Sequence, residues 1–482
     1  METPSTTSLS LFERFNSWIQ ESIMIKLFSI GFLIIVLLLP SAWIQELIVE
    51  RQSRAGEAIR EVSSKWSGAQ TLTGPVLIIP YRKQDVIDRG KDGIEIHERI
   101  EKAYFLPDEL NISGEVQPER LRRGIFDVAV YKSKIGLTSS FSQPNFNALS
   151  IPADKVLWNE AQLAFGLTDL RGISDTLSLT VGGKEMETEP SANIGVNIDS
   201  NTGAEFSEVY RGQYASSKIS TTGITTKLGW TNAEDFNGQI NLRMNLKGSQ
   251  RLDFVPVGKA TTVLLNGTWE NPSFDGEIIP TDRTLTDGSF SALWKTLHFN
   301  RPFPQQWTND SPVLKGSGVK LLIPVDQYQK SIRTSKYGIL IILLTFIALL
   351  LVEITQKIRI HPFQYILIGV ALIIYYTLLL SISEHAGYNV AYIIASVATV
   401  ILVSLYASTF LRERRLVAVF AGLLVIFYTF IFVIILQQDF SLLIGSIGLF
   451  LIVGLVMYFS RGINWYGSER ITSHKPGSQV IG

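Results

Sequence analysis

The chain has 482 residues, of which 46% are hydrophobic, and its 43 basic and 43 acidic residues give a formal net charge of zero. Such a balance gives no reason to expect a polyanionic partner, so we expect no nucleic acid. The chain contains no cysteine, which excludes a disulfide framework, a catalytic thiol and any cysteine-ligated metal site.

The chain begins with a short tail, residues 1–21, and an apolar run follows over residues 22–44. A cleaved signal peptide has a similar run, but the residues after Pro40 make a poor small-x-small cleavage site. We therefore predict an uncleaved transmembrane anchor, and Arg14 and Lys26 on its inner flank predict that the tail is cytoplasmic.

Beyond the anchor, residues 45–70 have apolar residues at helical spacing, with charged residues on the other faces. The apolar positions are Ile48, Ala55, Ile59, Val62 and Trp66. One interpretation is a stalk that packs on the following domain, and the other is a helix that lies on the lipid headgroups. The charges, Arg51 and Glu57 among them, are mixed rather than mainly basic, which favours the stalk.

From residue 71 to about Gln329 the hydrophobic period changes to two, which predicts a large, mostly antiparallel, sandwich-like β domain over residues 71–336. The strand candidates are 76–79, 103–106, 126–130, 161–167, 177–181, 194–198, 240–246, 263–265 and 319–323. Turn signals between them include Asn111 with Gly114, Gly182 with Gly183, and Lys247 with Gly248. The stretch 182–190 is a candidate seam between two lobes.

The last third of the chain, residues 337–460, contains five long apolar runs separated by short polar joints. The runs are 338–355, 363–382, 388–410, 416–436 and 440–459. Each is about long enough to cross a bilayer core of roughly 30 Å as a helix. With the anchor they predict an integral α-helical membrane protein with six transmembrane helices.

Basic residues alternate along the joints and predict the orientation of the chain. They occur on the first and third joints and on the tail, residues 461–482, whereas the second and fourth joints have neither Lys nor Arg. The determinants are Lys357, Arg359, Arg412, Arg414, Arg415 and Arg461. The positive-inside pattern therefore predicts cytoplasmic termini and an exported β domain.

Three polar residues of the membrane region are candidate functional residues, for proton relay or for ligand binding. Glu353 lies within the inner end of the second crossing, and Glu384 and His385 lie at the outer end of the third. Ionisable groups that are buried in a membrane are costly unless they are paired. The alternative is that all three lie at the interface and reach water. Aromatic residues such as Tyr365 and Tyr392 fit interfacial belts at least as well as a ligand site.

No pattern in the sequence predicts an enzyme. The five histidines are too scattered for a local metal motif, and neither a phosphate-binding glycine loop nor a nucleophile elbow is present. We therefore predict no catalytic residue, no cofactor and no metal. An envelope hydrolase would need a site assembled in the β domain from residues that are distant in sequence.

Specific stretches of the chain, rather than its apolar runs, resemble one known family. They begin at Val49 (Val-Glu-Arg), Gly74 (Gly-Pro-Val-Leu-Ile-Ile-Pro), Phe105 (Phe-Leu-Pro-Asp-Glu-Leu), Trp269 (Trp-Glu-Asn-Pro-Ser-Phe), Arg359 (Arg-Ile-His-Pro-Phe-Gln-Tyr), Ser383 (Ser-Glu-His-Ala-Gly-Tyr) and Arg461 (Arg-Gly-Ile-Asn-Trp-Tyr). Over about residues 20–468 the chain resembles the CreD family of bacterial inner-membrane proteins. The family is associated with envelope integrity and, in enteric bacteria, with tolerance to a colicin and induction by a two-component system. The resemblance implies location, topology and an envelope role, and supplies no catalytic or binding residues.

These observations predict a non-enzymatic inner-membrane protein of cell-envelope integrity or stress response. Its expected partners are the lipid bilayer and an envelope or membrane protein of unknown identity that the β domain meets. The alternative is a transporter or channel that uses Glu353, Glu384 and His385.

Overall fold

The computed structural model describes residues 23–88, 94–199, 218–308, 312–323, 326–356, 358–411, 413–437 and 440–461. The chain divides into two compact units, one of residues 1–52 with 325–482 and one of residues 53–324. The first unit is helical and the second is built mainly of strands. The change of hydrophobic period along the sequence reflects this division.

One long helix, α2 (Ile23–Trp66), contributes residues to both units. The sequence predicts an anchor followed by an amphipathic helix, and in the structure both stretches belong to this one helix. Pro40 lies inside it. Proline has no N–H to donate to the carbonyl one turn earlier, yet the helix continues past this position.

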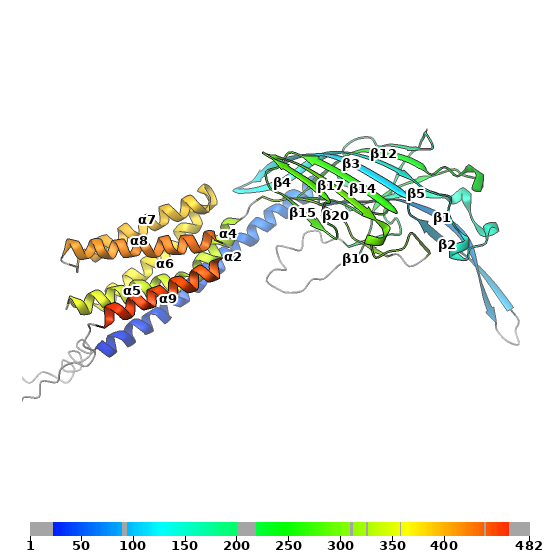
Figure 1. The fold of residues 1–482 in the computed structure, drawn as a ribbon. Coiled ribbons are helices and arrows are strands. Elements are labelled where there is room, and N and C mark those ends of the chain that lie inside the picture. The colour runs from blue at the N-terminus through cyan, green and yellow to red at the C-terminus, as the bar shows by residue number, and fades with distance from the viewer. Residues whose placement is uncertain are drawn as a thin grey trace, which may run out of the picture. The chain divides into compact units, whose positions relative to one another are not determined.

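The helical unit continues with α4 (Asp326–Lys336) and five apolar helices. These are α5 (Gly338–Thr355), α6 (Pro362–Ala386), α7 (Tyr388–Ala407), α8 (Arg414–Leu436) and α9 (Ser441–Ser460). By length and composition, α2 and α5 to α8 are able to cross a membrane, and α9 contributes a shorter described apolar stretch, Leu443–Tyr458. Figure 1 shows these helices. The predicted class, a six-helix membrane protein with a large β domain, is confirmed.

Local signals explain where two of these helices begin and end. Pro362 is the first residue of α6, and the preceding His361 caps the helix by accepting a hydrogen bond from the Phe363 N–H through Nδ1. Gln364 completes the cap, because its Oε1 accepts from the His361 N–H at 3.0 Å. Gly387, with φ of 77°, has a positive φ that favours glycine and lies between α6 and α7, so the two helices follow each other directly.

The short helix α4 was not predicted from the sequence, where a strand period was expected as far as Gln329. Tyr328 and Thr334 of α4 are buried, whereas Lys336 is exposed. The Thr334 hydroxyl shares a 2.5 Å hydrogen bond with the hydroxyl of Tyr388 on α7. This helix of 11 residues is mostly polar, and packing of its few buried residues against neighbouring helices stabilises it.

The described strands form two large sheets and a small one. The strands are β1 (Gln70–Asp88), β2 (Ile94–Phe105), β3 (Glu109–Arg123), β4 (Phe126–Ser140), β5 (Gln162–Leu167), β6 (Ser178–Val181), β7 (Lys184–Glu185), β8 (Glu189–Ser191), β9 (Asn197–Asp199), β10 (Lys218–Ser220), β11 (Gly223–Lys227), β12 (Gln239–Ser249), β13 (Arg251–Phe254), β14 (Ala260–Gly267), β15 (Pro272–Gly276), β16 (Asp282–Thr286), β17 (Ser289–Leu297), β18 (Gln306–Thr308), β19 (Val313–Leu314) and β20 (Ser317–Leu321). The 9-stranded sheet has the order β15-β20-β13-β1-β5-β11-β8, with β2 paired to β1 and β18 paired to β2. The 8-stranded sheet has the order β16-β17-β14-β3-β4-β12-β6-β7, and the small sheet is β10-β9-β19.

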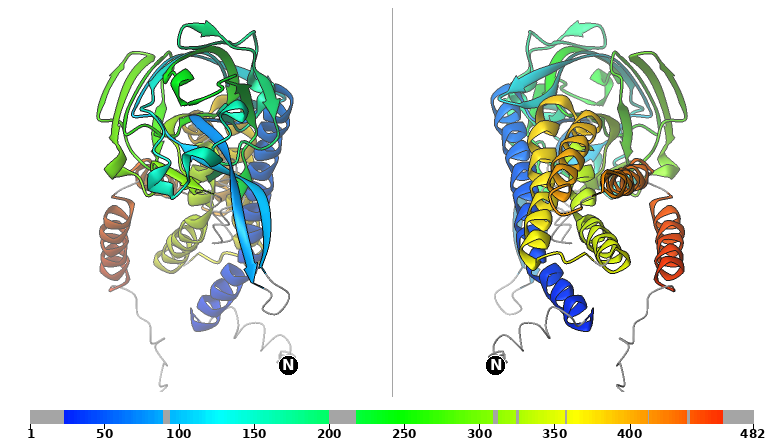
Figure 2. Two further views of the ribbon diagram at one scale, coloured as in Figure 1. Left: turned by 90° about the vertical axis from the view of Figure 1, so that its right-hand side faces the viewer. Right: turned by 90° about the vertical axis from the view of Figure 1, so that its left-hand side faces the viewer.

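Most pairs of the described strands are antiparallel, as predicted, but three of these pairs are parallel. They join β1 to β13, β3 to β14, and β9 to β19. Each parallel pair brings together strands that lie far apart in the sequence, because a parallel connection needs a long crossover. Figure 2 gives two further views of the strands around the core.

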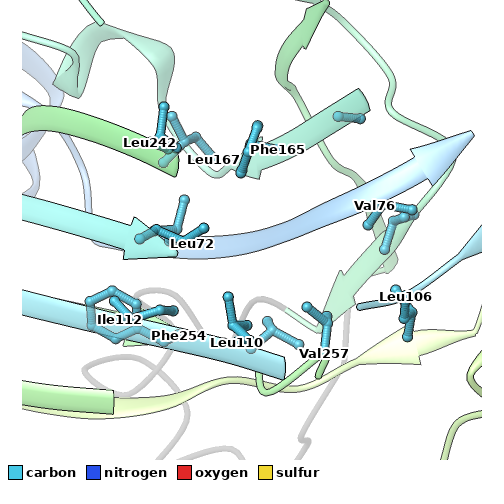
Figure 3. Close-up of a cluster of buried hydrophobic side chains, with 14 of the residues drawn as sticks. Leu72, Val76, Leu106, Leu110, Ile112, Phe165, Leu167, Leu242, Phe254 and Val257 are labelled. Atoms are coloured by element: carbon cyan, nitrogen blue, oxygen red, sulfur yellow. The ribbon is translucent and has the colours of Figure 1, made fainter. Parts of the chain in front are cut away.

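The hydrophobic core of the strand unit lies between the two large sheets. Along β3 exposed and buried residues alternate, so Leu110, Ile112 and Val116 face the core. Figure 3 shows Leu110 and Ile112 of β3 gathered with Leu72 of β1 and Leu242 of β12. Burial of each such side chain contributes about 1.5–3 kcal/mol before entropy is counted.

Two of the predicted turns are wrong. Asn111 and Gly114 lie within β3, and Lys247 and Gly248 lie within β12. A Cβ at position 114 would lie 2.6 Å from Cδ2 of Leu265, so this glycine serves close packing between strands rather than a turn. Gly182 and Gly183 do form the turn between β6 and β7.

Candidate functional site

Glu353 lies two residues before the end of α5 and is only 3% exposed. Its Oε1 lies 2.6 Å from Nζ of Lys26 on α2 and accepts a 3.3 Å hydrogen bond from the Ile360 N–H. Its Oε2 accepts a 2.9 Å hydrogen bond from the Tyr365 hydroxyl on α6. The alternative that this carboxylate simply reaches water therefore does not describe it.

The Lys26–Glu353 contact joins helix ends that are distant in the sequence. Lys26 is near the start of α2, and Tyr365 is in the first turn of α6. The contact therefore brings the start of α2, the end of α5 and the start of α6 to the same end of the helical unit. A carboxylate that accepts from three donors of one polar cluster is held in place, which is typical of a structural clamp.

Glu384 lies near the other end of α6 and is half-buried. Its Oε1 accepts a 3.1 Å hydrogen bond from the hydroxyl of Tyr328, which is fully buried on α4. Burial raises the pKa of the Tyr328 phenol, and the charge of the Glu384 carboxylate raises it further. The hydroxyl therefore stays protonated and remains a donor. Glu384 thus fastens α4 to α6.

His385, next to Glu384, has an exposed side chain. Within the described part of the chain it makes no hydrogen bond or ion pair, so it does not extend the Tyr328–Glu384 contact. Nor does the structure bring the three predicted residues together. Tyr365, which binds Glu353, and Glu384 are separated along α6 by about 28 Å, given a rise of 1.5 Å per residue.

The topology determinants lie at joints between the apolar helices. Arg359 lies between α5 and α6, Arg414 and Arg415 open α8, and Arg461 follows α9, with its guanidinium 4.6 Å from the Tyr458 ring centroid. Lys357 and Arg412 lie outside the described residues.

A cluster of tyrosines inside the helical unit was missed by sequence reasoning, which considered an interfacial belt or a ligand site for Tyr392. Tyr375 and Tyr376 on α6 are buried with Tyr392 on α7 and Tyr428 on α8. The Tyr375 ring lies 4.9 Å from that of Tyr428 and 5.9 Å from that of Tyr392. The Tyr392 hydroxyl donates to the Tyr428 carbonyl at 2.8 Å. The consecutive pair at 375–376, in the middle of an apolar run, is the signal that was available.

A second polar cluster fixes the last turn of α2 within the strand unit. Asp169 accepts hydrogen bonds from the Gly68 N–H at 3.0 Å and from the Ser67 hydroxyl at 3.2 Å. Arg171 donates to Asp169 and also, at 2.6 Å, to the Ser64 carbonyl. Burial acts to raise the pKa of Asp169, but the bonds from Arg171 and Gly68 outweigh it and hold the pKa at about 2. Asp169 is therefore ionised at neutral pH.

Among the described residues, no group of three or more His, Asp or Glu side chains is arranged to hold a metal ion. The polar contacts described above are structural in their geometry: each carboxylate is held by donors from other helices or loops.

Comparisons with known proteins agree with one another. A family model described as "Inner membrane protein CreD" matches residues 22–466. The inner membrane protein CreD of Escherichia coli (strain K12) is 28% identical over 445 residues, which cover 92% of this chain and 93% of that protein. The similarity therefore runs through both the helical unit and the strand unit.

Proposed function

This chain belongs to the CreD family of inner membrane proteins, and on that premise we propose that it maintains the cell envelope by binding rather than by catalysis. The strand unit faces the periplasm and meets an envelope partner, and both termini lie in the cytoplasm. The helical unit anchors the protein in the bilayer.

The observation that carries this proposal is that Glu353 and Glu384 of the helical unit are each hydrogen-bonded within a separate polar cluster. Glu353 accepts from Lys26, Tyr365 and the Ile360 backbone, and about 28 Å of α6 separates Tyr365 from Glu384. A transporter needs polar groups that converge on one path or one central site. The Lys26–Glu353 and Tyr328–Glu384 contacts instead hold helices together at two separate places, which supports a role as a membrane anchor.

Neutralising these groups distinguishes the anchor from a transporter or channel. The variant Lys26→Met, Glu353→Gln, Glu384→Gln, His385→Gln removes every proposed transport group and leaves no charge unpaired at position 26 or 353. We expect it to restore envelope-stress resistance to a deletion strain as well as the wild type does, at equal protein level in the membrane. Loss of resistance at equal level would favour the transporter.

Cysteine labelling tests the orientation, because the native chain has no cysteine to label. Single substitutions Lys227→Cys and Ala386→Cys should react with a membrane-impermeant maleimide in spheroplasts. Ile358→Cys and Glu413→Cys should react only after the membrane is opened. The reverse pattern would overturn the periplasmic assignment.

A further inference from the structure

The outer face of the 8-stranded sheet has a hollow of about 480 Å³ that none of the contacts described so far explains. Its side walls are polar side chains from β3, β4, β12, β14 and the start of β6. The lining side chains that point outward are Ser113, Glu115, Lys134, Thr176, Ser178, Arg243, Asn245 and Asn266. A volume of this size falls within the range of small-molecule sites, about 300–1,000 Å³.

Strand register explains why the hollow exists. One row across the sheet runs Ser113, Gly136, Arg243, Ser178, each residue paired with the next. Gly136 stands in the middle of this row and has no side chain, so the floor of the hollow is backbone. Every second residue of a strand points to the same face of the sheet. Thr138, two residues after Gly136 on β4, therefore lies on this outer face but beyond the hollow.

The next row places charges of both signs beside that floor. Glu115 faces Lys134, and Lys134 faces Asn245. Arg243 lies diagonal to Lys134, on the neighbouring strand, and both are exposed. Among the described residues, no ion pair joins Lys134 or Arg243 to a carboxylate. The lining of the hollow thus has two cations, one carboxylate and a set of hydroxyls and amides, while Asp175, outside the lining, accepts a 3.3 Å hydrogen bond from the Asn245 amide.

This chemistry restricts the ligand. The strands beneath the hollow, β14, β3, β4 and β12, are each paired on both sides, so a peptide cannot add to them as a further strand. The described lining has no aromatic ring, and its apolar members Ile135 and Met244 are buried in the core, which excludes a lipid chain. Sugar hydroxyls both donate and accept, as these side chains do, and the surplus cation matches an anionic substituent.

We propose that this hollow binds an acidic glycan, a chain of sugars that carries carboxylate or phosphate groups. Arg243 and Lys134 hold the anionic group, and Ser113, Asn245 and Asn266 bind sugar hydroxyls over Gly136. The site depends on the proposed function only for its periplasmic location. Its own test uses purified protein, so a negative result here leaves the topology experiment unaffected.

The probe is a short fluorescent oligogalacturonate, and binding to full-length protein in phosphatidylcholine nanodiscs is measured by anisotropy. Arg243→Gln and Lys134→Gln should each weaken binding at least about five-fold, as loss of a hydrogen bond to a charged group does. Arg283→Gln, the same change at an exposed position of β16, should leave the affinity within about two-fold.

A steric pair tests the hollow without changing its charge. Gly136→Val fills the floor and should abolish binding, while Thr138→Val, on the same face of β4, should not. Thermal unfolding of both variants, measured in parallel, shows whether the sheet is intact. If Gly136→Val unfolds the sheet, the two charge variants still decide the outcome.

Two further probes identify the ligand class. A neutral oligogalactose of equal length should bind more weakly than the acidic probe, and a polyglutamate of equal charge should not compete with it. Equal competition by polyglutamate, or binding that is insensitive to Arg243 and Lys134, would overturn the proposal. A free acidic glycan and a glycolipid with the same sugars, added to the nanodiscs, distinguish a soluble source from a membrane-borne one.

Discussion

Nζ of Lys26 lies 2.6 Å from Oε1 of Glu353, so the first turns of α2 are tied to the last turn of α5. The Lys26 side chain is 26% exposed, whereas that of Glu353 is 3% exposed. The carboxylate therefore depends on its partners, and its loss has consequences that can be measured.

Glu353→Gln should destabilise the helical unit. The change leaves the Lys26 ammonium without its counter-ion, and removing one partner of a buried pair costs about 3–5 kcal/mol, less here because Lys26 is partly exposed. We expect a loss of roughly 2 kcal/mol or more in unfolding of the purified protein in detergent. Lys26→Met combined with Glu353→Gln should recover part of that loss.

The matched control is Glu384→Gln, which removes a half-buried charge with one tyrosine partner at the other end of α6. It should cost less than about 1 kcal/mol. Equal losses for the two single variants, with no recovery in the double variant, would contradict a Lys26–Glu353 clamp.

Asp169→Asn should loosen the end of α2 within the strand unit. The single oxygen of the amide cannot accept hydrogen bonds from Arg171, Gly68 and Ser67 together as the carboxylate does. We expect the free energy of unfolding to fall by about 2 kcal/mol. Hydrogen exchange should rise over residues 60–68 while the core strand β3 stays protected. Asp154→Asn, at an exposed position of a short 3-10 turn, is the control and should leave this segment unchanged.

The effect of Asp169 depends on pH in a defined direction. Its pKa is about 2, against about 3.9 for an unfolded aspartate, so its stabilisation is present above about pH 4 and is lost as pH falls through 2. The wild type and Asp169→Asn should therefore converge in stability in acid. A difference between them that stays constant down to pH 2 would mean that the carboxylate charge is not what stabilises this junction.

Asp253 on β13 should give the opposite pH dependence. It is 5% exposed, and burial raises its pKa to about 6 although the Arg251 guanidinium, 2.5 Å from Oδ2, acts to lower it. Because the folded pKa lies above the unfolded value of about 3.9, the stabilisation is full below pH 4 and is lost as pH rises through 6.

Asp253→Asn removes this titration. The free energy of unfolding of the wild type should fall by about 3 kcal/mol relative to this variant between pH 4 and pH 8. Thermal or denaturant unfolding at a series of pH values measures the difference. Asp282→Asn, an exposed change on β16, should show no such trend.

Gly318→Ala should disrupt the junction of β13 and β20. A Cβ at this position would collide with the Leu252 carbonyl oxygen and lie 2.7 Å from the Asp253 Cα, and neither backbone atom can move freely within the sheet. We expect a loss of about 1–3 kcal/mol, measured by unfolding. At Gly136 the nearest atom is the Ser113 hydroxyl at 3.1 Å, which can rotate, so Gly136→Ala should cost less.

The membrane helices were predictable because run length alone predicts them. The predicted run 338–355 coincides with α5, and Pro362 marks the start of α6 as its chemistry suggests. By contrast, β3 was missed, because Asn111 and Gly114 were interpreted as a turn between the strand candidates 103–106 and 126–130. Leu110, Ile112 and Val116 kept the period of two, and Gly114 occupied an inward position where no side chain fits.

The candidate site could be found only in part from sequence. Glu353 stands out as a charge in an apolar run, but its partner Lys26 is 327 residues away, and no local pattern pairs them. The tyrosine cluster likewise depends on which faces of α6, α7 and α8 meet. The hollow over Gly136 needs the register of four strands, which a single sequence does not contain.

Because β1 pairs with β13, part of β1 must wait for its partner strand during biosynthesis. Gln70 to Leu72 are made about 180 residues before their partners Leu252 to Phe254, and a ribosome adding about 5–20 residues per second needs roughly ten to forty seconds for that interval. Throughout it, the edge of this stretch that later pairs with β13 has no strand partner. We therefore expect a holdase that binds such segments to raise the yield of the folded protein.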